Sequence, residues 1–145
     1  MLSNTSKYAI RAVIYLAVNS TKKNRIGIKQ IAGELDIPTP FLGKILQSLA
    51  RHKLLTSTKG PNGGFGLGKE PSKIKLIEIV EIIEGKDIFK SCLLGTKDCD
   101  HDKNICPIHE RYAEIREQFC ELFKKTTLSI LIKDLKQNKA TNIIL

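Results

Sequence analysis

The sequence predicts a mainly α-helical protein with one small β-hairpin, in which a helix-turn-helix unit and the hairpin precede a long C-terminal helix. Apolar residues recur at steps of three and four in most of the chain, which is typical of helices that bury one face. Alternation typical of strands occurs only from Leu54 to Leu67, where a Gly-Pro-Asn-Gly-Gly run interrupts it. The 145 residues, 41% of them hydrophobic, suit one compact domain or one domain with an added arm.

The first helix is expected over residues 3–20. Capping residue types open this stretch, and apolar residues follow over a wide arc, so the helix should be covered on two sides: Ala9, Ile10, Ala12, Val13, Ile14, Leu16 and Ala17. After a basic connection, a second and shorter helix is predicted by Ile28, Ile31, Ala32 and Leu35. A tight turn from Asp36 to Pro38 ends it.

A third helix is expected to begin after Thr39, because a capping residue there precedes the first-turn proline Pro40. Its buried stripe is Leu42, Ile45, Leu46 and Leu49. Two short helices joined by a three-residue turn predict a helix-turn-helix, although a plain helical hairpin would have the same spacing. The outward side chains of the third helix are short or polar enough to reach base edges in a major groove: Thr39, Phe41, Gly43, Lys44, Gln47 and Ser48.

The hairpin that follows is expected to form a wing beside the helix-turn-helix. Leu54 to Lys59 and Phe65 to Leu67 are its strands, and Asn62-Gly63 suits a tight turn between them. Lys53 and Lys59 are expected to flank the tip, and the glycines there would let the backbone approach a phosphate. A helix-turn-helix with a basic wing indicates a double-stranded DNA partner.

The charge is distributed unevenly. Residues 1–75 carry 13 Lys and Arg against 3 Asp and Glu, whereas residues 76–145 carry 11 against 12. A solvated basic face is the alternative reading of such an excess, but together with the wing it favours binding to a polyanion. No paired nucleophile and base, phosphate loop or paired carboxylates stand out, so we predict no enzymatic activity. No apolar run reaches the roughly 18 residues of a membrane span, and no leader is recognisable, which predicts a cytoplasmic protein without a membrane partner.

Another amphipathic helix, with Leu76, Ile79, Val80 and Ile83, should end at Gly85. Three of the four cysteines follow it as single residues with six residues between neighbours, and a histidine comes three residues later: Cys92, Cys99, Cys106 and His109. The surroundings are polar, so the thiols cannot be buried as small hydrophobes. Pro107 is expected at the first helical position, which would bring Cys106 and His109 together at a helix start.

Soft thiolates with one imidazole suit an iron–sulfur cluster or zinc. Structural zinc sites usually take their cysteines in close pairs, which are absent here, so an iron–sulfur cluster is favoured. A two-iron centre is the favoured form, and a four-iron centre is also compatible with the spacing. The fourth cysteine, Cys120, is expected to be a buried small hydrophobe.

The long helix after Pro107 has apolar residues at steps of four, three, four and three, which indicates a heptad seam between two copies of the chain: Ile108, Tyr112, Ile115, Phe119 and Leu122. Ordinary core packing would give the same spacing. A last helix with Leu128, Ile130, Leu131 and Leu135 should fold back on the body, and the end from Gln137 should be loose. We therefore divide the chain into a winged helix-turn-helix (1–85), a cysteine loop (86–106), and a dimerisation helix with a C-terminal helix (107–145).

With these features the sequence resembles the Rrf2 family of bacterial winged-helix regulators, and its motifs are most similar to the cluster-binding IscR-like members. The resemblance covers nearly the whole chain: SKYAIRAVIYLA, IAGELDIPTPFLGKILQSLARHKLL, KGPNGGFGLGK and the three cysteines before a long helix. It implies a homodimer whose two helix-turn-helix units bind a near-palindromic operator. It also implies a cluster beside the dimerisation helix that senses iron–sulfur status, oxidation or nitric oxide, in a regulator that acts as a repressor.

Residue by residue, the resemblance implies a cluster held by Cys92, Cys99, Cys106 and the IscR-type ligand His109. It also implies DNA contacts from the third helix and the wing: Thr39, Phe41, Lys44, Lys59, Gly60, Asn62 and Gly63. Two departures matter. Gly43 replaces an acidic residue of IscR-like members, so operator preference need not follow theirs. Lys7 stands where NsrR-like members can supply an acidic ligand, which favours His109 as the fourth ligand.

Two other functions are compatible with parts of the chain. A cluster-free regulator of the same family would use the cysteines as a thiol switch or a zinc site. A small electron carrier or redox enzyme would use the cluster for chemistry, but that function explains neither the wing nor the basic first half.

Overall fold

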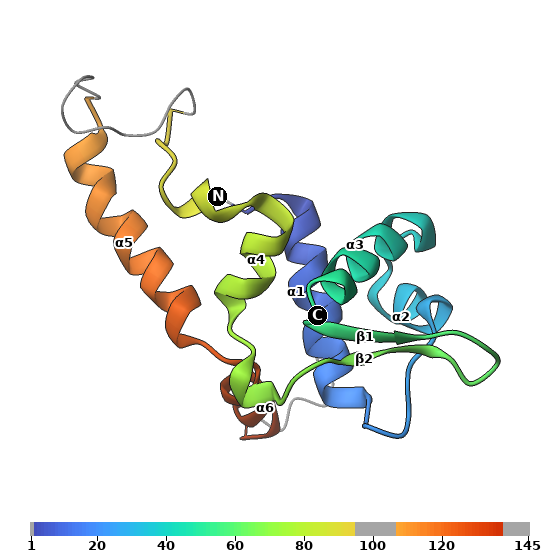
Figure 1. Ribbon diagram of the computed structural model, residues 1–145. Coiled ribbons are helices and arrows are strands. Elements are labelled where there is room, and N and C mark those ends of the chain that lie inside the picture. The colour runs from blue at the N-terminus through green and yellow to red at the C-terminus, as the bar shows by residue number, and fades with distance from the viewer. Residues whose placement is uncertain (1, 95–106, 138–145) are drawn as a thin grey trace.

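The computed structural model describes residues 2–94 and 107–137. The chain runs in the order α1 (Asn4–Asn19), α2 (Ile28–Leu35), α3 (Thr39–Arg51), β1 (Leu55–Thr58), β2 (Gly64–Leu67), η1 (Pro71–Lys73), α4 (Leu76–Glu84), η2 (Lys86–Phe89), α5 (His109–Lys125) and α6 (Leu128–Gln137) (Figure 1). The prediction of a mainly helical fold with one antiparallel hairpin is confirmed. The first four residues of the expected cysteine loop (86–106) belong to a short 3-10 helix, η2.

Helix α1 lies at the centre of the described structure and contacts α2, α3, α4, α6 and β2. Ala9, Ala12, Val13 and Leu16 are fully buried, which explains why the apolar arc of this helix is so wide. The helix begins as predicted, because the Ser3 side chain accepts a hydrogen bond from the Ser6 backbone N–H over 3.2 Å.

The helix-turn-helix consists of α2 and α3, and Asp36 between them adopts a left-handed conformation (φ 52°) that ends α2. The expected cap at Thr39 is wrong by one residue. Pro38 is the cap and Thr39 is already helical. The Pro38 carbonyl accepts hydrogen bonds from the N–H groups of Phe41 (3.1 Å) and Leu42 (3.0 Å). A backbone oxygen therefore accepts the N–H groups of the first turn that the Thr39 side chain was expected to cap.

In the wing, β1 pairs with β2 in the register Leu55↔Leu67 to Thr58↔Gly64. The expected Asn62-Gly63 turn is wrong. The Gly63 N–H donates to the Gly60 carbonyl over 2.9 Å, so Pro61 and Asn62 are the central residues of the turn. Proline suits the first central position because its ring fixes φ near the value required there. Lys53 lies at the base of the hairpin, where its φ of 59° ends α3, and therefore does not flank the tip.

An isolated bridge that was not predicted joins the hairpin to an earlier segment of the chain. Ile26, in the connection before α2, exchanges hydrogen bonds with Phe65 on β2, with N···O distances of 2.9 and 2.8 Å. This bridge joins the wing to the chain that leads into the helix-turn-helix. The position of the hairpin relative to α2 is therefore fixed through backbone bonds.

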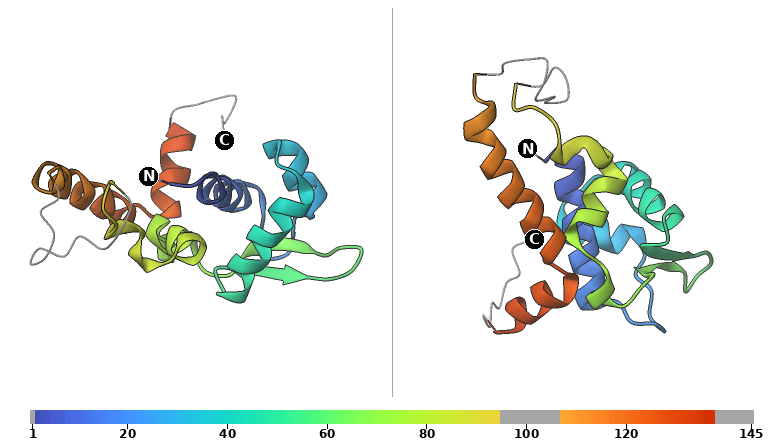
Figure 2. Two further views of the ribbon diagram at one scale, coloured as in Figure 1. Left: turned by 90° about the horizontal axis from the view of Figure 1, so that it is seen from above. Right: turned by 60° about the vertical axis from the view of Figure 1, so that its left-hand side comes forward.

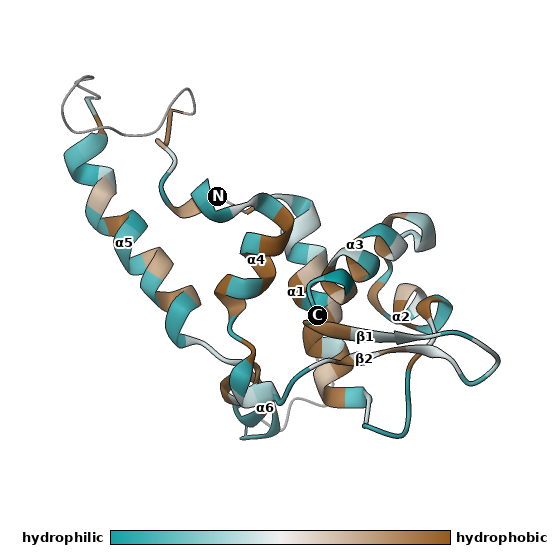
Figure 3. Cartoon of the chain, viewed as in Figure 1, coloured by the Kyte–Doolittle hydropathy of each residue, from teal (hydrophilic) through white to brown (hydrophobic). Residues whose placement is uncertain are grey.

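Helices α4, α5 and α6 complete the fold. Helix α6 packs on α1 and η1, and Leu128 is fully buried, which confirms that the last helix folds back on the body. Helix α5 projects away from the body in each view, and only its C-terminal half approaches α4 (Figures 1 and 2). Coloured by hydropathy, α5 is mostly hydrophilic with separate hydrophobic positions, whereas α1 and α4 are rich in apolar residues (Figure 3).

The start of α5 differs from the prediction. The helix begins at His109 with Ile108 as its cap, and Pro107 lies in the preceding turn and not at the first helical position. The Tyr112 N–H donates to the Ile108 carbonyl over 2.9 Å, so the first helical hydrogen bond closes at Ile108. The end of the chain after Gln137 lies outside the described residues.

None of the helices formed by residues 2–94 and 107–137 is both long enough and apolar enough to cross a bilayer.

Candidate DNA interface, cysteine segment and helix α5

Helix α3 presents one polar face outward and one apolar face inward. Leu42, Leu46 and Leu49 are fully buried against the body. On the other face Lys44 is exposed, Phe41 is 38% exposed, and Thr39 is half-buried. These three predicted DNA contacts therefore lie together on the N-terminal half of a helix with an exposed face. That is the part of a recognition helix that meets base edges in helix-turn-helix proteins.

The wing places Lys59, Gly60 and Asn62 in exposed positions next to that helix, and the hairpin projects beyond the body (Figures 1 and 2). Gly60 has a φ of 107°, which favours glycine over any other residue. A Cβ at Gly63 would collide with the Thr58 carbonyl oxygen and with that of Gly60. Gly63 is thus required by the packing of the turn itself, independently of any phosphate contact.

An open cleft of about 750 Å³ separates the C-terminal half of α3 from β1. Its polar lining comes from Gln47, Arg51, Lys53, Thr56 and Ser57. With the exposed Lys44 and Lys59, the cations Arg51 and Lys53 extend the positive surface from the recognition helix to the wing. Sequence reasoning did not include Arg51 among the DNA contacts, although the basic run from 51 to 53 was a signal for it.

Two residues of α1 support the helix-turn-helix, one at α3 and one at α2, and spacing did not identify them. The Tyr8 ring meets the Phe41 ring edge-on, with the centroids 5.8 Å apart. Arg11 donates a hydrogen bond to the Leu35 carbonyl over 2.8 Å, at the C-terminal end of α2. A tyrosine and an arginine among the apolar residues of α1 were the available signals.

The predicted metal ligands fall partly outside the described structure. Cys99 and Cys106 lie outside the described residues, while Cys92 and His109 are both half-buried. Within residues 2–94 and 107–137, no group of three His, Cys, Asp or Glu side chains lies close enough to hold a metal ion. Cys92 follows η2, and His109 is the first residue of α5.

The segments that bear Cys92 and His109 are fixed to each other. Phe89 on η2 packs against Phe119 and Phe123 of α5, with ring centroids 5.8 and 5.7 Å apart. Arg116 on α5 donates to the Lys90 carbonyl over 3.1 Å, two residues before Cys92. The chain therefore enters and leaves the cysteine segment on one packed unit, and a histidine opens the helix that forms part of it. A thiol and an imidazole held in this way fit an iron–sulfur cluster, and they would also fit zinc.

The predicted seam on α5 separates into inward and outward residues. Phe119 packs inside its own chain, with its ring centroid 4.7 Å from that of Phe123. Ile115 and Leu122 are 62% and 58% exposed, one heptad apart on the outer side. Ile108 and Tyr112 are half-buried, and the Arg116 guanidinium lies over the Tyr112 ring at 5.9 Å. Cys120 is half-buried and packs against the core, as a small hydrophobe does.

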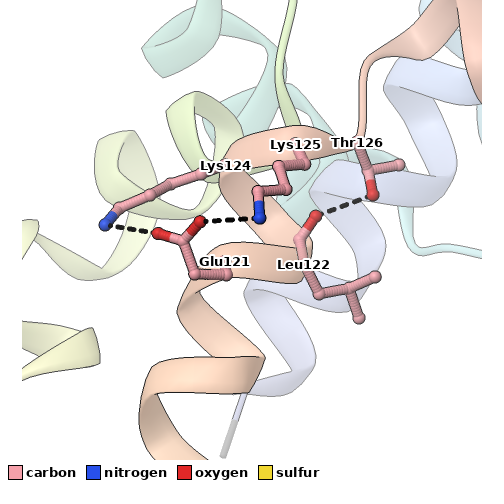
Figure 4. Close-up of polar contacts among 5 residues, drawn as sticks. All are labelled: Glu121, Leu122, Lys124, Lys125 and Thr126. Carbon is pink, nitrogen blue, oxygen red and sulfur yellow. Dashed lines mark hydrogen bonds and ion pairs between the residues drawn. The ribbon is translucent and has the colours of Figure 1, made fainter.

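Charged contacts strengthen the C-terminal end of α5. Glu121 pairs with Lys124 over 3.1 Å and with Lys125 over 3.3 Å, and the Thr126 hydroxyl donates to the Leu122 carbonyl over 2.7 Å (Figure 4). Hydrogen bonds from the two lysines lower the pKa of Glu121. The Leu122 side chain points away from these ion pairs, which leaves it available as an apolar contact (Figure 4).

Comparison with known proteins agrees with this geometry. A family model described as "Iron-dependent Transcriptional regulator", named Rrf2, matches residues 2–134. A protein of Aquifex aeolicus (strain VF5) assigned as an HTH-type transcriptional regulator is 36% identical over 133 residues, which cover 91% of each chain. The HTH-type transcriptional regulator NsrR of Bacillus licheniformis is 26% identical over 131 residues, which cover 90% of this chain and 91% of that one.

Two solved structures share the fold. CymR, the global cysteine regulator of B. subtilis, superposes with a TM-score of 0.76 at 24% identity, covering 90% of this chain and 95% of its own. T. potens IscR superposes with a TM-score of 0.76 at 21% identity, covering 99% and 93%. The family model over residues 2–134 and the Aquifex relative at 36% identity show that the chain belongs to the Rrf2 family of transcriptional regulators.

Proposed function

We propose that this Rrf2 regulator binds its operator as a homodimer, and that an iron–sulfur cluster in the cysteine segment controls its affinity for that operator. The observation that carries the proposal is the donor set of three single cysteines and His109, which follows η2 in the chain and ends at the first residue of α5. The cluster would sense iron–sulfur status, oxidation or nitric oxide. The protein would act in the cytoplasm as a repressor of transcription.

Cys92, Cys99, Cys106 and His109 would hold the cluster. A bound cluster supplies a redox-sensitive and oxygen-sensitive anionic centre. The residues of the chain contribute its ligands and its support: thiolates are favoured near a helix N-terminus, and His109 opens α5. Since Phe89 and Arg116 fix η2 to α5, a change at the ligands would act on both ends of the segment.

On the DNA side, α3 would enter the major groove and the wing would contact the neighbouring backbone. Thr39, Phe41 and Lys44 lie at the exposed N-terminal half of α3, and Lys59, Gly60, Asn62 and Gly63 form the wing tip. In a two-fold homodimer the two α3 helices would contact half-sites one or more helical turns apart, about 10–10.5 base pairs for one turn.

The two lysines of this surface should have different effects on binding. Lys59→Gln should weaken binding to all duplexes alike and reduce the dependence on salt, because a phosphate contact bears no sequence information. Lys44→Gln should change the preferred sequence, because position 44 faces base edges. Both effects are measured by fluorescence anisotropy, with operator and unrelated duplexes as probes. The salt concentration is varied between 50 and 200 mM, roughly the range over which phosphate contacts weaken strongly. Lys136→Gln, on α6 away from this surface, is the matched control. Affinity that does not change with salt would contradict the electrostatic part of the proposal.

The cofactor is tested by purifying the protein anaerobically and measuring iron, acid-labile sulfide and zinc per chain. Stoichiometric iron and sulfide with visible absorption would support the cluster. Zinc without sulfide would indicate a structural metal site and overturn the cluster proposal. A protein with neither, but with reversible thiol oxidation that alters DNA binding, would be a thiol-switch regulator.

A further inference from the structure

One carboxylate joins the two ends of the DNA-binding half. The Ser3 backbone N–H donates to Glu84 Oε1 over 3.0 Å, and the buried Ser6 hydroxyl donates to the same oxygen over 2.6 Å. The Ser3 hydroxyl also donates to Oε1, while it accepts the Ser6 N–H as the cap of α1. The residues are 81 and 78 positions apart in sequence, and three donors converge on one carboxylate oxygen.

The charge of Glu84 also meets a need of α1. No acidic residue occurs in the first turn of this helix, where a negative charge interacts favourably with the helix dipole. Glu84 supplies that charge from the last residue of α4. Charge-assisted hydrogen bonds of this kind are roughly twice as strong as neutral ones. The contact therefore fixes the start of α1 to the end of α4.

The ionisation of Glu84 follows the same geometry. Partial burial opposes its charge, but hydrogen bonds from the Ser3 and Ser6 hydroxyls and the Ser3 N–H outweigh burial, with help from the positive chain terminus. Together they lower the pKa of Glu84 below its ordinary value. The folded state therefore favours the ionised form, so the contact is complete at neutral pH and is lost as the pH falls through the lowered pKa.

On one side, this contact leads to the DNA-binding surface through α1. Tyr8 and Arg11 follow Ser6 within about one and a half turns of the helix. Tyr8 packs on Phe41 of the recognition helix, and Arg11 bonds the last carbonyl of α2. A shift of the first turns of α1 would therefore move the supports of both helices of the helix-turn-helix.

On the other side, the contact leads to the cysteine segment. Glu84 ends α4, Gly85 turns the chain with a φ of 91°, and η2 begins at Lys86. Phe89 of η2 then packs on α5, and Cys92 follows three residues later. Glu84 is thus bonded to α1 at the point where the chain leaves α4 for the segment of the proposed ligands.

We propose that Glu84 is a positioning residue that transmits the state of the cysteine segment to the recognition helix through Ser3 and Ser6 of α1. This inference rests on the proposed function, because it assumes that the cysteine segment has two states with different operator affinities. A movement of η2 would be passed to α1 through one carboxylate and not through the apolar core alone.

Glu84→Gln removes the charge but keeps the shape. Its effect is measured by the ratio of the operator dissociation constants of holo and apo protein, determined anaerobically. The probe is a duplex selected by wild-type protein from a pool of random sequences. We expect the ratio of the variant to approach one, with an unchanged cluster absorption spectrum and unchanged affinity for unrelated DNA. Ser6→Ala, which removes one of the three donors, should move the ratio part of the way towards one and remains informative if Glu84→Gln folds poorly.

Glu81→Gln is the matched control, because it removes the same charge one turn earlier on α4 and should keep the wild-type ratio. A wild-type ratio above or below one that Glu84→Gln and Ser6→Ala both retain would overturn the inference and leave the proposed function intact. A wild-type ratio of one would instead overturn the proposed function, and with it the transmission.

Discussion

Replacing Ile115 with glutamate is expected to convert a homodimer into a monomer and to weaken operator binding by about a hundredfold or more. Ile115 is 62% exposed on the outer side of α5 in the single chain, and Leu122 lies one heptad further on. An unpaired carboxylate buried in the interface would cost about 3–5 kcal/mol. About 1.4 kcal/mol corresponds to a factor of ten in the dissociation constant. A cost of this size is therefore enough to dissociate a dimer with a modest interface.

Sedimentation velocity of the variant measures this directly, and operator binding is measured in parallel. Glu117→Lys is the control, because position 117 lies two residues along α5 and faces roughly the opposite side of a helix with 3.6 residues per turn. We expect the control to remain dimeric. Ile115→Glu that sediments as an unchanged dimer would exclude the outer side of α5 from the interface.

Phe119 belongs to the same predicted seam but is unsuited to this experiment. Its ring packs on Phe89 and Phe123 of its own chain, so a charge at that position would also disrupt the packing of α5 on η2. A Phe119 variant that sediments as a monomer could therefore have lost either its dimer interface or the packing of α5 within its own chain. The two exposed positions, Ile115 and Leu122, separate these effects.

Cys99→Ala is expected to abolish the cluster completely, which is the second large effect. Removing one thiolate ligand would leave an iron position that no other cysteine of the segment replaces, because each of the three single cysteines would already be a ligand in the proposed site. Iron and sulfide should fall to background in anaerobically purified protein. His109→Ala should leave a labile centre, since water, His101 or an external thiol can substitute for an imidazole.

Cys120→Ala provides the matched control, because it removes a thiol of α5 that packs against the core. This variant should keep the wild-type iron and sulfide content and the wild-type absorption spectrum. A full cluster in Cys99→Ala, or its loss in Cys120→Ala, would contradict the assigned ligand set.

Sequence periodicity was sufficient for the helices and the hairpin, because each buries one strongly apolar face. The spacing of Leu42, Leu46 and Leu49 predicted one buried face of a helix, and all three residues are fully buried. Local chemistry was less reliable at the element ends. Pro38 capped α3 through its carbonyl, which accepted bonds that had been assigned to the Thr39 side chain. Pro61 shifted the wing turn by one position, because its fixed φ suits the first central position of the turn.

Contacts between distant segments could not be predicted from spacing. A heptad on α5 has the same pattern whether its residues meet their own chain, as Phe119 does, or remain exposed, as Ile115 does. The bond from Ser6 to Glu84 spans 78 positions, and nothing in either neighbourhood indicates the other. The spacing of the cysteines and His109 was enough to propose a ligand set, and the outward face of the third helix was enough to propose DNA contacts. The resemblance to the family then selected individual positions within that surface.

Operator affinity, measured anaerobically for holo protein, apo protein and Cys99→Ala, tests the central claim most directly. The account predicts that holo protein differs from the other two by tenfold or more on at least one operator, which requires only about 1.4 kcal/mol of coupling between the cluster and DNA. It also predicts that apo protein and Cys99→Ala behave alike and remain folded. Three equal affinities on every operator tested would contradict the claim that the cysteine segment controls DNA binding.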